Sequence, residues 1–297
     1  MSIYGTVKQV MSMIFNLGSI NADHIYRLPH LPAPGETLAT DSYHRTLGGK
    51  GANQSVAAAR AGERVCHIGA VGPDGGWMVD LLDGYGVEVG HVARSDVPSG
   101  HAVVCVDDAG ENAIIIYPGA NRALDFSDVT SALGAASPDD WLMMQNETNL
   151  QMETARLVRT GGLNLAYSAA PFDADAVRAV LPFVTILILN DVEAHQLEQA
   201  MGAIDVPQLL ITHGAEGAEW RDNVSGEVIL CPAFPVTPVD TTGAGDTFAG
   251  YMVASLAQGL APRAALRRAS AAAALQVQRP GTAEAIPTST ETAVLLA

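Results

Sequence analysis

Short apolar runs of strand length alternate with amphipathic helical stretches along most of the chain. The runs are Met13–Leu17, Val65–Val71, Trp141–Met144, Leu163–Tyr167, Ile186–Leu189 and Gln208–Thr212. Between them lie the amphipathic stretches Asn53–Ala61, Leu150–Thr160 and Asp191–Ala200. Continuous apolar strands separated by helices are typical of a parallel sheet that is covered by helices on both faces. The sequence therefore predicts an α/β fold whose ligands bind at the carboxyl ends of the strands.

Three further segments have strand character without helices between them, namely Gly35–Leu47, Ser99–Asp107 and Asn112–Tyr117. Their residues alternate or are β-branched, which predicts a small antiparallel sheet inserted into the core at about residues 35–47 and 99–118. The connection Asp107–Glu111 has the acidic and glycine residues typical of a hairpin turn. Such a β-unit covers a ligand site as a lid or forms a contact between subunits, and the sequence leaves both roles open.

Composition limits the class of protein. With 297 residues, of which 48% are hydrophobic, the chain can bury a large core, and it contains no charge run or Pro-rich linker. We therefore expect one domain over residues 1–297. A net charge of −16 disfavours nucleic acid and anionic membranes as partners, because both require a broad basic surface.

The cysteines and the N-terminal stretch favour the cytoplasm. The cysteines are odd in number and widely spaced, as free thiols in a reducing compartment often are; they are Cys66, Cys105 and Cys231. The N-terminal apolar stretch is broken by polar residues and is too short for a signal peptide or a membrane span. A start at Met11 or Met13 would make residues 1–10 an extension, and the sequence leaves this open.

The segment Asp240–Phe248 (DTTGAGDTF) places small residues directly before a helix expected at Gly245–Gln258. Glycines allow successive backbone N–H groups to point at one spot, and a helix N-terminus adds about half a positive charge. This arrangement suits a phosphate or a developing oxyanion, with Asp246 beside it. The alternative is that Asp246 merely caps the helix, as aspartate often does.

A second glycine turn, Gly48–Gln54 (GGKGANQ), also opens a helix. Lys50 opposes the helix dipole at this position, which is explained if Lys50 or the neighbouring N–H groups face an anionic or hydroxyl-rich ligand. A solvated lysine on a flexible turn is the equally weighted alternative. Asn21 and Asp23 follow the first strand, and in an extended chain their side chains would point the same way toward a pair of hydroxyl groups. An Asx turn is the alternative for that segment.

Asn190 and Glu193 follow the Ile186–Leu189 run and lie three residues apart at the start of a helix. Oxygen atoms in this arrangement can hold Mg²⁺ through water. A capping box explains the same pattern equally well.

Other common catalytic motifs do not occur in the sequence. It has no G-x-x-x-x-G-K-[ST] phosphate loop, no G-x-S-x-G elbow, no C-x-x-C and no histidines at metal-ligand spacing. A dinucleotide-dependent oxidoreductase is disfavoured, because its glycine fingerprint follows an early strand whereas Gly243–Gly245 lie near the C-terminus.

Taken together, these segments resemble the ribokinase family of carbohydrate kinases, also called the phosphofructokinase B family. The resemblance runs from about Phe15 to Pro287, and its two signatures are Gly48–Gly62 and Asp240–Phe248 in the expected order. It implies a three-layer α/β/α core with a mostly parallel sheet and a small inserted β-sheet lid. It also implies transfer of a phosphoryl group from ATP to the primary hydroxyl of a sugar, with Mg²⁺.

The resemblance assigns a role to each candidate residue. Asp246 would be the base, and the anion hole would be Gly243, Ala244 and Gly245. The sugar ligands would be Asn21, Asp23, Gly49, Lys50, Asn53 and Glu147. The nucleotide site would contain Asn190, Thr212, Gly214 and Gly217, with Asn190 and Glu193 organising Mg²⁺ through water. A K⁺ ion would be bound by Asp240 and by carbonyl groups near Thr242, Arg279 and Gly281.

Three segments depart from the family pattern. The connection from Met201 to Gln208 is shorter than usual, and Ala285 stands where a hydroxyl often reaches the monovalent cation. Ser168–Pro171 (SAAP) replaces the more common Asn-Pro-Ala-Pro, so the sugar specificity is open.

Gly18–Thr37 looks most like the ribose-phosphorylating branch of the family, which places ribose first among the acceptors. Fructose, 2-keto-3-deoxygluconate and a nucleoside are the alternatives. An alternative from another class is a regulatory protein that binds sugar and nucleotide without turnover, and the presence of Asp246 and Lys50 argues against it. The inserted β-unit also suggests a homodimer formed through the lid.

Overall fold

The computed structural model describes residues 12–297, so the predicted extension at residues 1–10 lies outside the described part. Its core is a nine-stranded sheet in the order β13-β12-β11-β10-β9-β8-β1-β4-β5. The strands are β1 (Met13–Leu17), β4 (Arg64–Val71), β5 (Glu88–Arg94), β8 (Trp141–Met144), β9 (Asn164–Ser168), β10 (Ile186–Asn190), β11 (Gln208–Thr212), β12 (Ala218–Asp222) and β13 (Glu227–Cys231). The seven strands from β11 to β5 are parallel, and β12 and β13 extend the sheet antiparallel.

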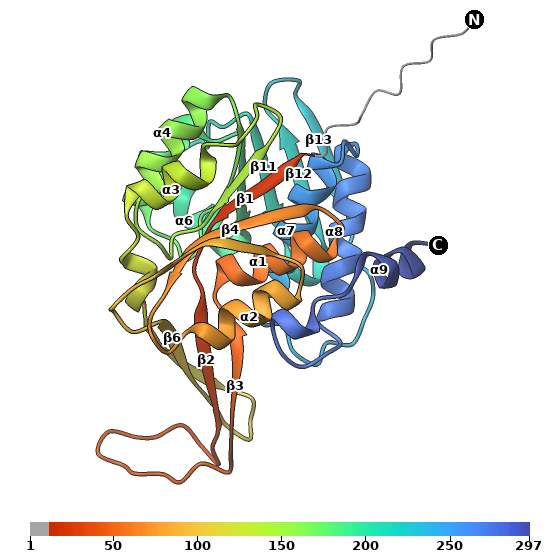
Figure 1. Ribbon diagram of the computed structural model, residues 1–297. Helices are drawn as coiled ribbons and strands as arrows, with labels where there is room; N and C mark the ends of the chain where they lie inside the picture. Colours follow the sequence, from red (N-terminus) through yellow and green to blue (C-terminus); the bar gives the residue numbers. More distant parts are fainter. Residues whose placement is uncertain (1–11) are drawn as a thin grey trace, which may run out of the picture.

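Helices cover both faces of this sheet, as the apolar runs predict (Figure 1). One face is covered by α1 (Lys50–Arg60), α2 (Gly76–Gly84), α7 (Ala244–Ala257) and α8 (Pro262–Gln276). The other face is covered by α3 (Phe126–Leu133), α4 (Gln151–Gly161), α5 (Ala174–Val180) and α6 (Asp191–Met201). The C-terminal α9 (Ser289–Leu296) packs on α8. The architecture is therefore the predicted three-layer α/β/α core.

A separate four-stranded sheet projects from one end of this core (Figure 1). Its order is β3-β2-β6-β7, with β2 (Asn21–Arg27), β3 (Ser42–Gly48), β6 (Gly100–Val106) and β7 (Asn112–Tyr117). The β6–β7 hairpin lies where we predict it.

The predicted strand at residues 35–47 is wrong in its first half, because residues 35–41 lie outside any strand and β3 begins at Ser42. The sequence analysis also misses β2, which pairs antiparallel with β3 and parallel with β6. The lid sheet is therefore mixed, and the prediction of a purely antiparallel sheet is wrong. Asn21 and Asp23 are therefore strand residues, and the Asx-turn alternative for them is wrong. The sequence analysis also misses β12 and the two edge strands β5 and β13, because polar residues interrupt their apolar pattern.

No helix among residues 12–297 combines the length and the apolar character needed to cross a lipid bilayer.

Candidate active site

The two glycine turns of the sequence lie next to each other, because α1 and α7 pack together directly. Gly250 in α7 allows this close approach: a Cβ atom there would lie 2.5 Å from the Cβ of Ala57 and 2.6 Å from the carbonyl oxygen of Gln54. The helices begin after Gly49 (φ 92°) and Gly243 (φ 75°), both in the left-handed region that favours glycine. The turns therefore bring Lys50 and Asp246 near each other, and the polar region around these two residues is called the cleft below.

Asp246 is the carboxylate at the centre of this cleft. Its side chain is 9% exposed and accepts hydrogen bonds from Asn53 Nδ2 at 3.2 Å and from Gln54 Nε2 at 3.1 Å. The N-cap residue of α7 is Gly243, so the helix-capping alternative for Asp246 is wrong. The carboxylate is oriented by α1 rather than by its own helix.

The turn before α7 offers backbone N–H groups beside Asp246. The N–H of Ala244 donates to the carbonyl oxygen of Thr241 at 3.2 Å, so it is partly engaged. Among residues 12–297, the N–H groups of Gly243 and Gly245 have no protein acceptor. A Cβ on Gly245 would meet no atom within 4 Å, so space for an incoming group lies against this turn.

Lys50 is half-buried among carboxylates. Its pKa is raised, mainly by the negative charge of Asp246 and further by Glu147 and Glu193, while burial opposes the shift. Lys50 is therefore the cation that offsets three carboxylates, and it stays protonated at neutral pH.

Glu147 lies beside the Lys50 turn from the loop after β8. Its Oε2 accepts hydrogen bonds from the Ser19 hydroxyl and from the Lys50 backbone N–H, the latter at 3.0 Å. The neighbouring Asn146 binds the divergent SAAP loop, since its N–H donates to the Ala170 carbonyl at 3.0 Å and its Nδ2 to the Pro171 carbonyl at 3.0 Å. This departure from the family pattern therefore lies next to the candidate sugar ligand Glu147.

The lid strand β2 brings two further predicted ligands to the cleft. Asn21 is buried, and its Oδ1 accepts a hydrogen bond from Asn121 Nδ2 at 2.7 Å. Burial, and after it the charges of nearby carboxylates, raises the pKa of Asp23 to about 7; these carboxylates are Glu147, Glu284 and Asp246. Asp23 is therefore poised to change its protonation state near neutral pH.

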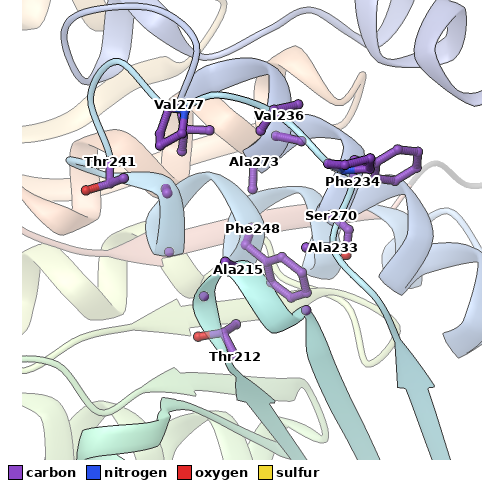
Figure 2. Close-up of a pocket in the computed structure, with 17 residues that line it drawn as sticks. Thr212, Ala215, Ala233, Phe234, Val236, Thr241, Phe248, Ser270, Ala273 and Val277 are labelled. Carbon is purple, nitrogen blue, oxygen red and sulfur yellow. The ribbon is translucent and has the colours of Figure 1, made fainter.

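A cavity of about 430 Å³ lies on the other side of the α7 turn (Figure 2). Its lining is mostly apolar and includes Phe234, Val236, Phe248, Ala273 and Val277. The predicted nucleotide residues Thr212, Gly214 and Gly217 also line it, and so do Ala244 and Gly245. Gly245 lines the cavity and directly precedes Asp246. One end of a molecule in this cavity would therefore lie at the anion-binding turn, next to the candidate base.

Asn190 and Glu193 form the capping box that the sequence analysis leaves open. Asn190 Oδ1 accepts from the Glu193 N–H at 2.9 Å, and Glu193 Oε2 accepts from the Asn190 N–H at 2.9 Å. Burial raises the pKa of Glu193, and so does the charge of Asp246, whereas the charge of Lys50 lowers it. Glu193 is therefore near enough to Lys50 and Asp246 to interact with their charges. Capping occupies one atom of each side chain and leaves Asn190 Nδ2 and Glu193 Oε1 available.

Asp240 joins the two loops predicted to hold a monovalent cation. Its Oδ1 accepts from the Thr242 N–H at 2.9 Å and its Oδ2 from the Gly281 N–H at 3.1 Å. The side chain of Arg279 points to α9, where it pairs with Glu291 at 2.6 Å. Ala285 is buried and has no side-chain oxygen. Among the described residues, no group of three or more His, Cys, Asp or Glu side chains is arranged to hold a metal ion.

Sequence reasoning missed three polar residues of the site, Gln54, Asn121 and Ser19. Gln54 stands next to the predicted ligand Asn53, but helical neighbours usually point in different directions, so its bond to Asp246 was not expected. Asn121 and Ser19 act through contacts across 101 and 128 residues of chain, which no local pattern reveals.

A carboxylate between a polar cleft and a nucleotide-sized cavity, on a three-layer α/β core, is the arrangement of a small-molecule kinase. The pattern described as "pfkB family carbohydrate kinase" matches residues 11–289. The chain is 34% identical to the ribokinase of Haemophilus influenzae over 294 residues, which cover 93% of this chain and 95% of that protein. It is 32% identical to the ribokinase of Bacillus subtilis over 299 residues, with 96% and 100% covered. The chain therefore belongs to the pfkB family of carbohydrate kinases.

Solved structures support the same family. Arabidopsis thaliana ribokinase complexed with ribose and ATP superposes with a TM-score of 0.86 at 29% identity, covering 96% of this chain and 98% of that one. Cryptococcus neoformans ribokinase in complex with ADP superposes with a TM-score of 0.85 at 29% identity, covering 96% and 99%.

Proposed function

We propose that the protein transfers the γ-phosphoryl group of ATP to the primary hydroxyl of ribose. The observation that carries this proposal is the position of Asp246. It lies against Asn53 of the lysine-bearing turn, and the N–H groups of Gly243 and Gly245 lie between it and the apolar cavity without an acceptor among residues 12–297. The relatives named ribokinase and the solved ribokinase structure with ribose and ATP support ribose and ATP as the substrates.

Asp246 acts as the base in this proposal. The bonds from Asn53 and Gln54 hold its carboxylate in one orientation, beside the proposed sugar site. Phosphoryl transfer leaves little covalent work for the protein, so a weak base suffices, because the alcohol proton can leave late in a loose transition state. The N–H groups of Gly243 and Gly245 stabilise charge on the transferring phosphoryl group.

The sugar binds between the lid strand and the Lys50 turn. The residues around this space carry carboxylate and amide groups that match the hydroxyl groups of a pentose. They are Asn21, Asp23, Gly49, Lys50, Asn53 and Glu147. The adenine ring occupies the cavity behind Gly245, where Thr212, Gly214 and Gly217 line one wall. This placement lets the phosphate chain run along the N-terminus of α7.

Mg²⁺ and K⁺ fit the oxygen donors on either side of the nucleotide. Glu193, with Asn190, would hold Mg²⁺ through water, since its Oε1 is not used by the capping box. When bound, Mg²⁺ would supply positive charge to neutralise and orient the phosphate chain. Asp240 and the carbonyl groups of Thr242, Arg279 and Gly281 would hold K⁺, with no hydroxyl from Ala285.

The lid also offers a surface for a second copy of the chain. In β7, the edge strand of the lid sheet, Ile114, Ile115 and Ile116 are 53%, 71% and 54% exposed. An exposed apolar edge strand is a site for pairing with another chain. A homodimer through the lid would cover this strand.

An ADP-release assay over ribose, fructose, 2-keto-3-deoxygluconate and nucleosides, with and without K⁺, tests the proposal. We expect the highest kcat/KM with ribose. Phosphorylation of another acceptor with a higher kcat/KM would overturn the assignment of ribose. Nucleotide binding without ADP release for every acceptor would favour the non-catalytic alternative.

A further inference from the structure

A continuous chain of buried polar side chains lies behind Asp246, and neither the sugar cleft nor the nucleotide cavity uses it. Its members come from β1, β4, α1 and the end of β8, and each is at most 1% exposed: His67, Ser55, Asn16, Gln145 and Gln54. Burying so many polar groups is costly unless they form hydrogen bonds. The sequence of donors and acceptors along the chain therefore determines how each side chain is oriented.

The direction of the chain is set at its far end by His67. Its Nε2 lies 3.1 Å from the carbonyl oxygen of Gly18, and a carbonyl only accepts, so Nε2 carries the hydrogen. Complete burial lowers the pKa of His67 to about 4, so the ring is neutral and Nδ1 must accept. The Ser55 hydroxyl, 2.8 Å away, therefore donates to Nδ1.

The next two links follow from this choice. Asn16 Nδ2 donates to the Gly51 carbonyl at 2.9 Å and to the Ser55 oxygen at 2.9 Å, which uses both of its hydrogens. Its Oδ1 then accepts from Gln145 Nε2 at 2.9 Å. The other hydrogen of Gln145 Nε2 goes to Gln54 Oε1 at 2.7 Å.

Only one orientation of the Gln54 amide is compatible with this sequence of donors. Its Oε1 is held by Gln145, so its NH₂ group must face Asp246, 3.1 Å from Oδ1. A flipped amide would place two NH₂ donors against each other at the Gln145 end and two oxygen acceptors against each other at the Asp246 end. Since Asn53 binds the second oxygen of the carboxylate, both Asp246 oxygens receive an N–H from α1.

We propose that Gln54 is a positioning residue for Asp246, and that the chain from the Gly18 carbonyl through His67 to Gln145 fixes its amide orientation. The inference rests on the proposed function of Asp246 as the base. Gln54 itself is fully buried and acts through Asp246 rather than on the substrates. The carboxylate plane is held so that a lone pair faces the alcohol when the phosphoryl group arrives.

The test compares Gln54→Met with Gln145→Met, since methionine keeps the volume and removes the amide. For Gln54→Met we expect kcat to fall about 10–100-fold while the KM for ribose changes less than about threefold, because geometry at the base is lost and sugar contacts are kept. Gln145→Met keeps the Gln54 side chain but frees it to flip, so its loss of kcat should be smaller, about fivefold.

A double-mutant cycle separates positioning from a purely structural effect. In an Asp246→Asn background, Gln54→Met should lower kcat less than about twofold further, because there is no base left to orient. A structural role predicts that the two losses multiply. Ser255→Ala, which removes another buried hydroxyl farther along α7, is the matched control and should keep wild-type kcat.

Each outcome decides the matter. Wild-type kcat in Gln54→Met, or multiplying losses in the cycle, would overturn the inference while leaving the proposed function intact. An inactive wild-type enzyme in the same assay would overturn both. If Gln54→Met does not fold, Gln145→Met and Ser55→Ala test the same chain, and full kcat in both would overturn the inference.

Discussion

Asn53 Nδ2 donates a hydrogen bond to Asp246 Oδ2 at 3.2 Å, across 193 residues of chain. This bond joins the two glycine turns, which the sequence places in its first and last thirds. It exists because Gly250 lets α7 lie against the backbone of α1. The proposed phosphoryl transfer depends on this contact. It holds the turn proposed to bind the phosphoryl group beside the turn proposed to bind the acceptor sugar.

Replacing Asp246 by asparagine tests the base directly. Asp246→Asn keeps the size of the side chain and removes the proton acceptor, so kcat should fall roughly 10²–10⁴-fold. The KM for ATP should change little, since the apolar cavity is untouched. ADP release and thermal unfolding measure the two effects, and a folded variant with wild-type kcat would rule out Asp246 as the base.

Lys50 has an electrostatic role that a second variant isolates. Lys50→Met leaves Asp246, Glu147 and Glu193 without their shared cation, and three nearby carboxylates repel phosphate. We expect kcat/KM for ATP to fall at least about tenfold, with partial recovery in Lys50→Arg. Steady-state kinetics of both variants checks this, and equal losses in the two would indicate steric rather than charge effects.

The core of the fold follows from the sequence because its strands are fully buried. Runs such as Trp141–Met144 and Ile186–Leu189 are covered on both faces, so they stand out as uninterrupted apolar segments. The strand β2 does not stand out. It carries Asn21 and Asp23 toward the cleft, while His24 and Tyr26 meet aromatic partners in the lid sheet, so its sequence looks like a polar loop.

The candidate site divides in the same way. The two glycine turns have local sequence signals, because a helix start after a left-handed glycine requires particular residues. The residues that orient Asp246 have none. Gln54 is linked to Gln145 across 91 residues, and only the packing of α1 against the sheet shows that their amides meet.

The raised pKa of Asp23 predicts a pH dependence of sugar binding. Its pKa is about 7 because of burial and the nearby carboxylates, so the side chain gains a proton as the pH falls below 7. A neutral carboxyl group is a poorer acceptor for sugar hydroxyl groups. The KM for ribose should therefore rise as the pH falls from about 8 to 6. Asp23→Asn should bind more weakly and lose this dependence.

The same shift has a consequence for stability with the opposite sign. The folded-state pKa of Asp23 lies above its ordinary value of 3.8, so the folded state binds more protons between these values. Its contribution to stability is therefore lost as the pH rises from about 4 to 7. Thermal unfolding should show a smaller loss over this range in Asp23→Asn, and an unchanged loss would contradict the raised pKa.

The apolar cavity predicts a variant with a selective nucleotide defect. Ala273 faces this cavity from α8, and a leucine there would occupy space beside Phe234 and Val277 (Figure 2). Ala273→Leu should raise the KM for ATP about tenfold and leave the affinity for ribose unchanged. Ala264→Leu, at an exposed position of the same helix, is the control. A larger effect on the KM for ribose than on the KM for ATP would show that the nucleotide does not bind in this cavity.

The exposed strand β7 predicts the last measurable property, the oligomeric state. Ile115 is 71% exposed at the centre of the edge strand, where apolar side chains would otherwise face water. We expect a dimer by sedimentation, which Ile115→Lys converts to a monomer, because a buried charge at a strand-pairing interface is unfavourable. Val224→Lys, on the remote β12–β13 turn where Val224 is 83% exposed, should leave the dimer intact. A monomeric wild-type protein, or equal behaviour of the two variants, would mean that β7 does not pair with a second copy.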